Sequence, residues 1–135
     1  MSSIPISIKN YVIQAGANDY ASGTSLEDFE KNIQSMINML YTKDVHACFL
    51  TPIRRVGGEN ENSVGKKLSE YVDKLLELCN LNGISCKDIY NYSGLNPDNP
   101  YNKEKYFLDN INLNKTGHTL IGKMCIEYVK ENTWD

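Results

Sequence analysis

The chain has 135 residues, of which 41% are hydrophobic and 23% charged, a composition typical of one ordinary globular domain. Its formal net charge of −3 gives no reason to expect nucleic acid or an anionic membrane as partner. No apolar run approaches the roughly 20 residues of a membrane span. The first residues lack a basic region followed by an apolar segment, so no signal peptide is visible, and the expected location is cytoplasmic or unknown.

The cysteines show no metal-ligand spacing. Four are present, each in an otherwise apolar segment and none in a Cys-x-x-Cys pair: Cys48, Cys79, Cys86 and Cys125. This pattern favours buried free thiols over disulfides and makes a zinc site unlikely on spacing alone. We therefore expect no metal and no cofactor.

Two apolar segments and one amphipathic segment open the chain. Residues 4–8 alternate as a half-buried strand does, and residues 11–15 begin with a continuous apolar run typical of a strand buried on both faces. Ser25, with Asp28 three residues later, has the pattern of a helix capping box. Apolar residues then recur at helical spacing, so we expect a helix over residues 25–41.

The rest of the chain continues this alternation. The pattern predicts strands over 45–51 and 84–90, helices over 63–81 and 115–131, and polar loops over 53–62 and 91–106. Strands that alternate with helices form right-handed β-α-β units and a parallel sheet. The expected fold is therefore a three-layer α/β domain with a small parallel sheet, formed by residues 1–135 as one unit.

A polar block follows the strand at residues 11–15. Gly16 permits a sharp turn there, and Asn18 can direct a side-chain amide at an oxygen on which negative charge develops. In open α/β sheets, ligands bind beyond the carboxyl ends of the strands. The block therefore has the chemistry of one half of an oxyanion-binding site.

Three blocks in this order resemble the SGNH (GDSL-like) hydrolases. Residues 16–19, Gly-Ala-Asn-Asp, resemble the family's Gly-x-Asn-Asp block, and Thr51-Pro-Ile-Arg54 resembles its Thr-Pro-x-x-Arg segment. Residues 109–118 resemble its last block, Asp-x-x-His-x-Asn-x-x-Gly-His. The resemblance implies a flavodoxin-like SGNH architecture and ester hydrolysis by a Ser-His-Asp arrangement. It places Gly16 and Asn18 at the oxyanion or substrate-binding position.

The same resemblance shows two departures from the family. Asp109 falls on the acid position of the triad, but Asn112 stands where the family has its catalytic His, and an amide cannot serve as a general base. His118 matches a family position for which we expect a structural or capping role, and we expect His46 to be packed or solvent-facing. No Gly-Asp-Ser block precedes the Asn block, so the chain resembles an N-terminally incomplete SGNH domain that lacks the first two strands.

Three functional interpretations follow. The first is a lineage of acyl or O-acetyl ester hydrolases, possibly carbohydrate-directed, inactive as an isolated chain because it is degenerate, truncated or a fragment of a split protein. The second is a glycan- or receptor-binding module of a phage-related or surface assembly, for which the Asn- and Tyr-rich residues 90–106 suit sugar contacts. The third, an unrelated flavodoxin-like protein, is disfavoured by the order of the motifs.

The expected partners follow from these interpretations. They are a small-molecule ester or a glycan, and a second copy of the chain. Without a neighbouring first strand, residues 11–15 form a sheet edge that invites pairing between two molecules. As an alternative, Ile4, Ile6 and Ile8 fold back along that edge.

Overall fold

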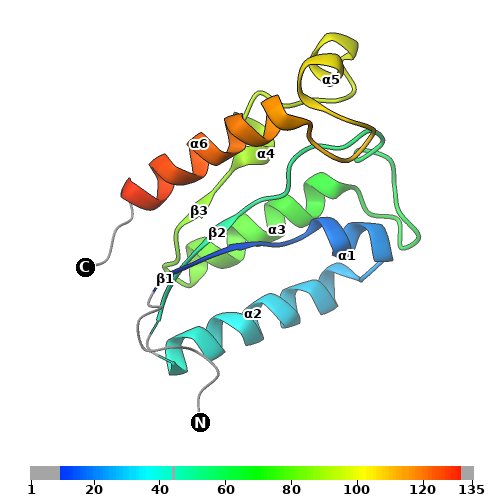
Figure 1. Cartoon of the computed structure of the whole chain (residues 1–135). Coiled ribbons are helices and arrows are strands. Elements are labelled where there is room, and N and C mark those ends of the chain that lie inside the picture. The colour runs from blue at the N-terminus through cyan, green and yellow to red at the C-terminus, as the bar shows by residue number, and fades with distance from the viewer. Residues whose placement is uncertain (1–9, 44, 132–135) are drawn as a thin grey trace.

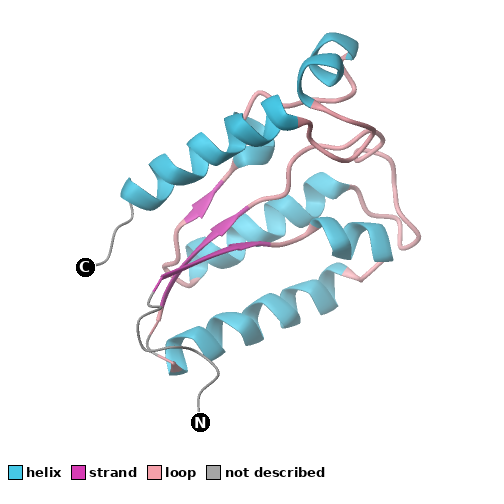
Figure 2. Ribbon diagram, in the orientation of Figure 1, coloured by secondary structure: helices cyan, strands magenta, loops and turns pink. Residues whose placement is uncertain are grey.

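The computed structural model describes residues 10–43 and 45–131. Three parallel strands form its sheet in the order β1-β2-β3: β1 (Asn10–Gln14), β2 (His46–Leu50) and β3 (Cys86–Lys87). β1 pairs with β2 along its whole length, from Asn10 opposite His46 to Gln14 opposite Leu50, whereas β3 pairs through two residues only. All three carboxyl ends therefore lie at one end of the sheet (Figure 2).

Helices cover both faces of this sheet, which gives the expected three-layer α/β arrangement (Figure 1). The helices in chain order are α1 (Ala17–Ser22), α2 (Leu26–Thr42), α3 (Leu68–Leu81), α4 (Ile89–Tyr92), α5 (Pro100–Tyr106) and α6 (Lys115–Glu131). α2 and α3 pack on one face, and α6 packs on the other.

The larger part of the core lies between the sheet and the α2–α3 layer. Phe29, Ile33 and Ile37 of α2 meet Tyr71 and other buried residues of α3, as the helical periodicity of both segments predicts. A smaller cluster under α6 joins Tyr128 to the opposite face of β2. Because apolar burial drives folding, these two clusters fix the sheet between its helical layers.

The helices predicted near residues 25–41 and 115–131 are confirmed, with Ser25 accepting a hydrogen bond from the Asp28 amide at 3.1 Å. The helix predicted over 63–81 begins only at Leu68, because Gly65 has a φ of +74° in the preceding loop. In α6, Val129 is 37% exposed, although the periodicity placed it on the inward face.

Two other expected segments differ more. The strand expected over 84–90 contains only Cys86–Lys87, because the Asp88 side chain accepts a hydrogen bond from the Asn91 amide and caps α4. The loop expected over 91–106 contains α5, which is capped by Asn99. The strand predicted at residues 4–8 lies outside the described residues.

Candidate functional site

The turn after β1 is built around Gly16. Its φ is +121°, a conformation that L side chains rarely adopt, and a Cβ there would lie 3.1 Å from Pro52 Cγ. Gly16 is also the N-cap residue of α1, so Asn18 and Asp19 lie in the first turn of a helix. Asn18 is exposed beyond the carboxyl end of β1.

Helix α1 is held in place by Tyr20. The buried Tyr20 side chain donates its O–H to the carbonyls of Gly57, at 2.9 Å, and Asn60, at 2.7 Å. Asn62 donates its side-chain amide to the Tyr20 carbonyl at 2.9 Å. The loop between β2 and α3 is therefore bound to the helix that carries Asn18.

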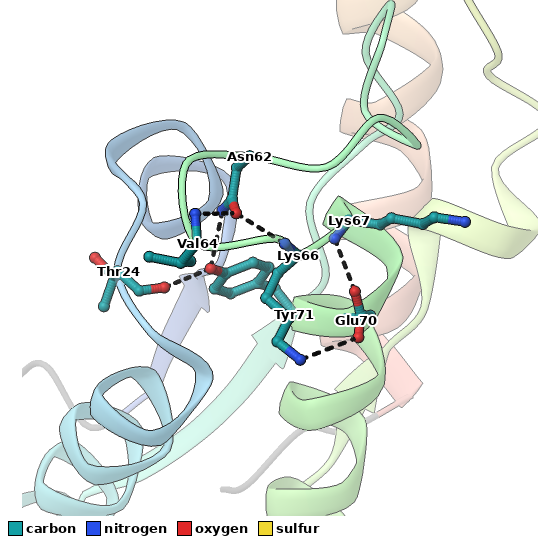
Figure 3. A network of polar contacts seen from close by, with 7 residues as sticks. All are labelled: Thr24, Asn62, Val64, Lys66, Lys67, Glu70 and Tyr71. Atoms are coloured by element: carbon teal, nitrogen blue, oxygen red, sulfur yellow. Dashed lines mark hydrogen bonds and ion pairs between the residues drawn. The ribbon is translucent and has the colours of Figure 1, made fainter.

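The other end of this loop is fixed by a polar network (Figure 3). Asn62 accepts hydrogen bonds from the Val64 and Lys66 amides and donates to the Tyr71 hydroxyl at 3.0 Å. The Tyr71 O–H in turn donates to the Thr24 carbonyl. Buried polar groups need such partners, so the network fixes the loop to both α1 and α3.

The Thr-Pro-x-x-Arg segment has a bracing role in this structure. The buried Thr51 hydroxyl accepts the Tyr90 amide at 2.9 Å and donates to Asp88 Oδ1 at 3.4 Å. Arg54 donates Nε to the Tyr90 carbonyl at 3.1 Å and lies 4.1 Å from the centroid of the Tyr90 ring. Burial, followed by a hydrogen bond with Glu59, raises the pKa of Tyr90. These contacts join the end of β2 to the segment that follows β3.

Asp109 and Asn112 are brought together, as their spacing predicts. Asn112 donates its side-chain amide to Asp109 Oδ2 at 2.9 Å and its backbone N–H to Oδ1 at 2.6 Å. The Ile111 N–H donates to the same Oδ1 at 2.8 Å. These bonds, that of the Asn112 side chain above all, lower the pKa of Asp109 to about 2. The exposed Asp109 carboxylate thus accepts three hydrogen bonds from the residues of its own turn and stabilises that turn.

The two histidines lie elsewhere. His118 is exposed in the first turn of α6, and its backbone N–H donates to the Asn114 carbonyl at 2.9 Å. His46 is exposed at the amino end of β2, which agrees with the solvent-facing alternative. A hollow of about 300 Å³ lined in part by Tyr41, His46 and Ser85 is also at that end, so it is separate from the candidate site.

The two halves of the predicted site are connected through neighbouring residues. The Val56 N–H donates to the Asn110 carbonyl at 2.9 Å, and Gly57, the next residue, accepts the hydrogen bond from Tyr20. The loop after β2 therefore contacts both α1 and the turn that contains Asp109 and Asn112. That Gly16, Asn18 and Asp109 cluster at the carboxyl ends of the strands, with Asn112 near them, stays a prediction, because these contacts join their segments and not their side chains.

Sequence reasoning missed Tyr20, Asn62 and Val56 as organisers of the site. Their contacts are long-range hydrogen bonds, most of them to backbone carbonyls, and no local pattern signals such partners. Within residues 10–43 and 45–131, no cluster of three or more His, Cys, Asp or Glu residues has the arrangement of a metal site. No helix in the same ranges is long and apolar enough to cross a membrane.

Among the comparisons with known proteins, the one with solved structures finds matches, and these concern the fold. The sequence matches no protein-family model and no curated protein. Among solved structures, a protein of Lactobacillus plantarum matches with a TM-score of 0.84 at 20% identity, over 98% of this chain and 71% of that one. A lipase/acylhydrolase from Enterococcus faecalis matches with a TM-score of 0.71 at 20% identity, over 92% of this chain and 62% of that one.

An acetyl xylan esterase matches with a TM-score of 0.69 at 24% identity, over 90% of this chain and 67% of that one. The chain therefore spans between 62% and 71% of the length of these three proteins. At such identities the likeness concerns the fold. Together with the ordered blocks at residues 16–19, 51–54 and 109–118, it establishes that this chain has the fold of the SGNH (GDSL-like) hydrolases.

Proposed function

We propose that this chain is an SGNH-type ester hydrolase-like domain for acyl or O-acetyl esters carried on carbohydrate, and that as an isolated chain it does not turn them over. The observation that carries the proposal is the hydrogen bond between Asn112 Nδ2 and Asp109 Oδ2, at 2.9 Å. In a catalytic triad the acid pairs with the imidazole of a His, whereas Asp109 pairs with the Asn112 amide.

The chemistry of the triad explains why this difference matters. A catalytic imidazole donates one N–H to the carboxylate and accepts the nucleophile's proton at its other nitrogen. Asn112 supplies the donor to Asp109 but has no basic nitrogen, so it cannot accept that proton near neutral pH. Removal of a triad member leaves only the small contribution of oxyanion and substrate binding. We therefore expect ligand binding without turnover.

The names of the structural neighbours support the ligand class. One is a lipase/acylhydrolase and one an acetyl xylan esterase, which acts on acetyl groups of a polysaccharide as its name states. Neither fixes the substrate of this chain, since both are less than 25% identical to it. They make acyl and O-acetyl esters the first compounds to test.

A second candidate is a glycan- or receptor-binding module of a phage-related or surface assembly. It is favoured by Tyr92 and Tyr101, which are 79% and 84% exposed in the segment that contains α4 and α5. Exposed aromatic faces stack on sugar rings, and neighbouring Asn side chains supply hydrogen-bonding groups for hydroxyls. This function needs no nucleophile.

Paired measurements separate the two candidates. Hydrolysis of p-nitrophenyl acetate and of acetylated xylan is followed with the purified chain, and the same protein is applied to a glycan array containing acetylated and deacetylated sugars. We expect hydrolysis at the background rate and binding that requires the acetyl group. Binding that ignores the acetyl group and is lost in Tyr101→Ala would favour the glycan-binding module. Hydrolysis abolished by Asp109→Asn would contradict the inactive assignment.

A further inference from the structure

Cys79 and Cys86 lie in the same part of the core. Cys79 is on the inward face of α3 and is 1% exposed, and Cys86 of β3 packs against the same apolar cluster. The two thiols are close enough for each to shift the pKa of the other. The other two cysteines, Cys48 and Cys125, belong to the cluster on the opposite face of the sheet. In the part of the chain that the structure describes, Cys79 and Cys86 are the pair of cysteines in which each thiol shifts the pKa of the other.

A tight turn keeps these thiols together. The Asn82 N–H donates to the Leu78 carbonyl at 3.1 Å, and the Ile84 N–H donates to the Cys79 carbonyl at 2.8 Å. Gly83, with a φ of +67°, allows the chain to reverse directly after α3. β3 therefore runs back along the helix it has just left (Figure 1), and α3 and β3 pack together.

We propose that Cys79 and Cys86 form an oxidisable dithiol that closes to a disulfide and clamps β3 to α3. A disulfide requires two Cβ atoms about 4 Å apart with converging directions. Cys79 and Cys86 belong to one apolar cluster and lie on elements that pack together across a tight turn, which favours such an approach. The proposal concerns the fold and is independent of the ester-hydrolase assignment.

The electrostatics of the pair assign a role to each sulfur. The hydrogen bond from Cys86 lowers the pKa of Cys79, although burial opposes this change, and the same contact raises the pKa of Cys86. In this proposal Cys79, the thiol whose pKa is lowered, is the one that attacks the oxidant first. Because Cys79 is buried, the fitting oxidant is small and uncharged, as hydrogen peroxide is.

The atoms balance in two steps. The Cys79 sulfur attacks one peroxide oxygen, the O–O bond breaks, and a sulfenic acid and one water form. The Cys86 sulfur then displaces the hydroxyl from that sulfenic acid, forming the S–S bond and a second water. Two thiols are oxidised and one peroxide is reduced.

The clamp acts on the most weakly paired strand of the described sheet. β3 pairs with β2 only through Phe49 opposite Cys86 and Leu50 opposite Lys87. The Phe49 N–H donates to the Ser85 carbonyl at 2.9 Å, and the Thr51 N–H donates to the Lys87 carbonyl at 3.1 Å. A covalent link to α3 holds these acceptors in place, so local opening becomes rarer.

The sequence allows a direct test by mass spectrometry. Trypsin cleaves after Lys74 and Lys87, so both cysteines fall in one peptide, residues 75–87. The folded chain is treated with peroxide, denatured, alkylated with N-ethylmaleimide and digested. We expect this peptide to carry no maleimide and to be lighter by two hydrogens, and prior reduction to restore two maleimides. Hydrogen exchange at the Phe49 and Thr51 amides is expected to slow in the oxidised form.

Variants define the outcomes. Cys48→Ser, in the other cluster, is expected to oxidise as the parent does, whereas Cys79→Ser leaves Cys86 open to alkylation. A peptide 75–87 that still takes two maleimides, or that carries sulfinic acid in place of the link, overturns the proposal. A bond from Cys86 to Cys48 or to a second molecule also overturns it. The parent chain alone gives each of these outcomes, so the test does not depend on a variant that fails to fold.

Discussion

The Asn112 side-chain amide donates a hydrogen bond to Asp109 Oδ2. An imidazole at this position would donate the same hydrogen bond and could also accept a proton from a nucleophile. We expect Asn112→His alone to leave hydrolysis of p-nitrophenyl acetate at the background rate, because a base without an activated nucleophile does not complete the chemistry. The sequence contains no Gly-Asp-Ser block to supply one. Turnover that appears in Asn112→His and disappears when Asp109→Asn is added would show that another residue of this chain acts as the nucleophile.

Asp109 gives a pH-dependent prediction at the same turn. Its pKa is lowered from 3.8 to about 2, first by the Asn112 side chain and then by the backbone N–H groups of Asn112 and Ile111. The folded pKa lies below the unfolded one, so the charged carboxylate stabilises the turn above about pH 4. This contribution is lost as the pH falls toward 2.

The titration of the Asp109 carboxyl carbon, followed by NMR, measures this directly. We expect a midpoint near 2 in the parent chain and a higher midpoint in Asn112→Ala, because the largest cause of the shift is then removed. Asn80→Ala, an exposed change on α3, serves as the control and is expected to leave the midpoint unchanged. An Asp109 midpoint that does not respond to Asn112→Ala would contradict the role assigned to this hydrogen bond.

At the scale of an element, α6 contains two glycines with opposite surroundings. A Cβ at Gly117 would lie 2.3 Å from the Tyr106 carbonyl oxygen and 2.9 Å from Leu113 Cδ2, whereas a Cβ at Gly122 meets nothing within 4 Å. We expect Gly117→Ala to destabilise the fold by about 1–3 kcal/mol through overpacking. Gly122→Ala is expected to stabilise it by roughly 0.5–1 kcal/mol, since Ala is the better helix former.

Urea unfolding of the two variants beside the parent measures both effects, and each variant is the control for the other. Equal free energies of unfolding for Gly117→Ala and Gly122→Ala would contradict the close approach of α6 to the segment around Leu113. The expected difference gives a structural reason for the Gly in the Gly-His part of the last block, independent of catalysis.

The elements that the sequence predicted are those whose signal is local and repeated. α2 and α6 each have 17 residues and an apolar periodicity of several turns, so packing and pattern agree. α1 has six residues, a glycine at its N-cap and no side-chain cap, so it gives no comparable signal. α5 has Asn99 at its N-cap and Pro100 at its first position, a helix-start signal that the expectation of a polar loop over 91–106 did not use.

The contacts of the candidate site are likewise of two kinds, local contacts that the sequence predicts and long-range contacts that it does not. The contact of Asp109 with Asn112 is local, three residues apart, and motif spacing predicted it. The connection of their turn to α1 passes through Val56 and Tyr20, more than 30 residues from their partners, where no spacing rule applies. Motif spacing therefore predicts local contacts, whereas tertiary hydrogen bonds decide how distant segments meet.

At the scale of the whole molecule, the outer side of β1 is the feature that bears on association between copies. Among the described residues this strand pairs only with β2, and Val12 on it is 44% exposed. Strand edges with unpaired backbone groups invite pairing with another chain unless they are covered. Of the residues that the structure describes, the apolar cluster under α6 includes residues of β2 and none of β1.

We propose that two copies associate through antiparallel pairing of β1, which gives a two-fold dimer with one continuous sheet. Sedimentation equilibrium over a concentration range is expected to show the mass rising from the 15.3 kDa of one chain toward twice that value. Val12→Lys places a charge on the edge strand and is expected to shift the equilibrium to the monomer, whereas Met39→Lys, at an exposed position of α2, is not. A monomer at high micromolar concentration whose β1 amides resist exchange would rule out the dimer, and would assign the edge to cover by another part of the same chain.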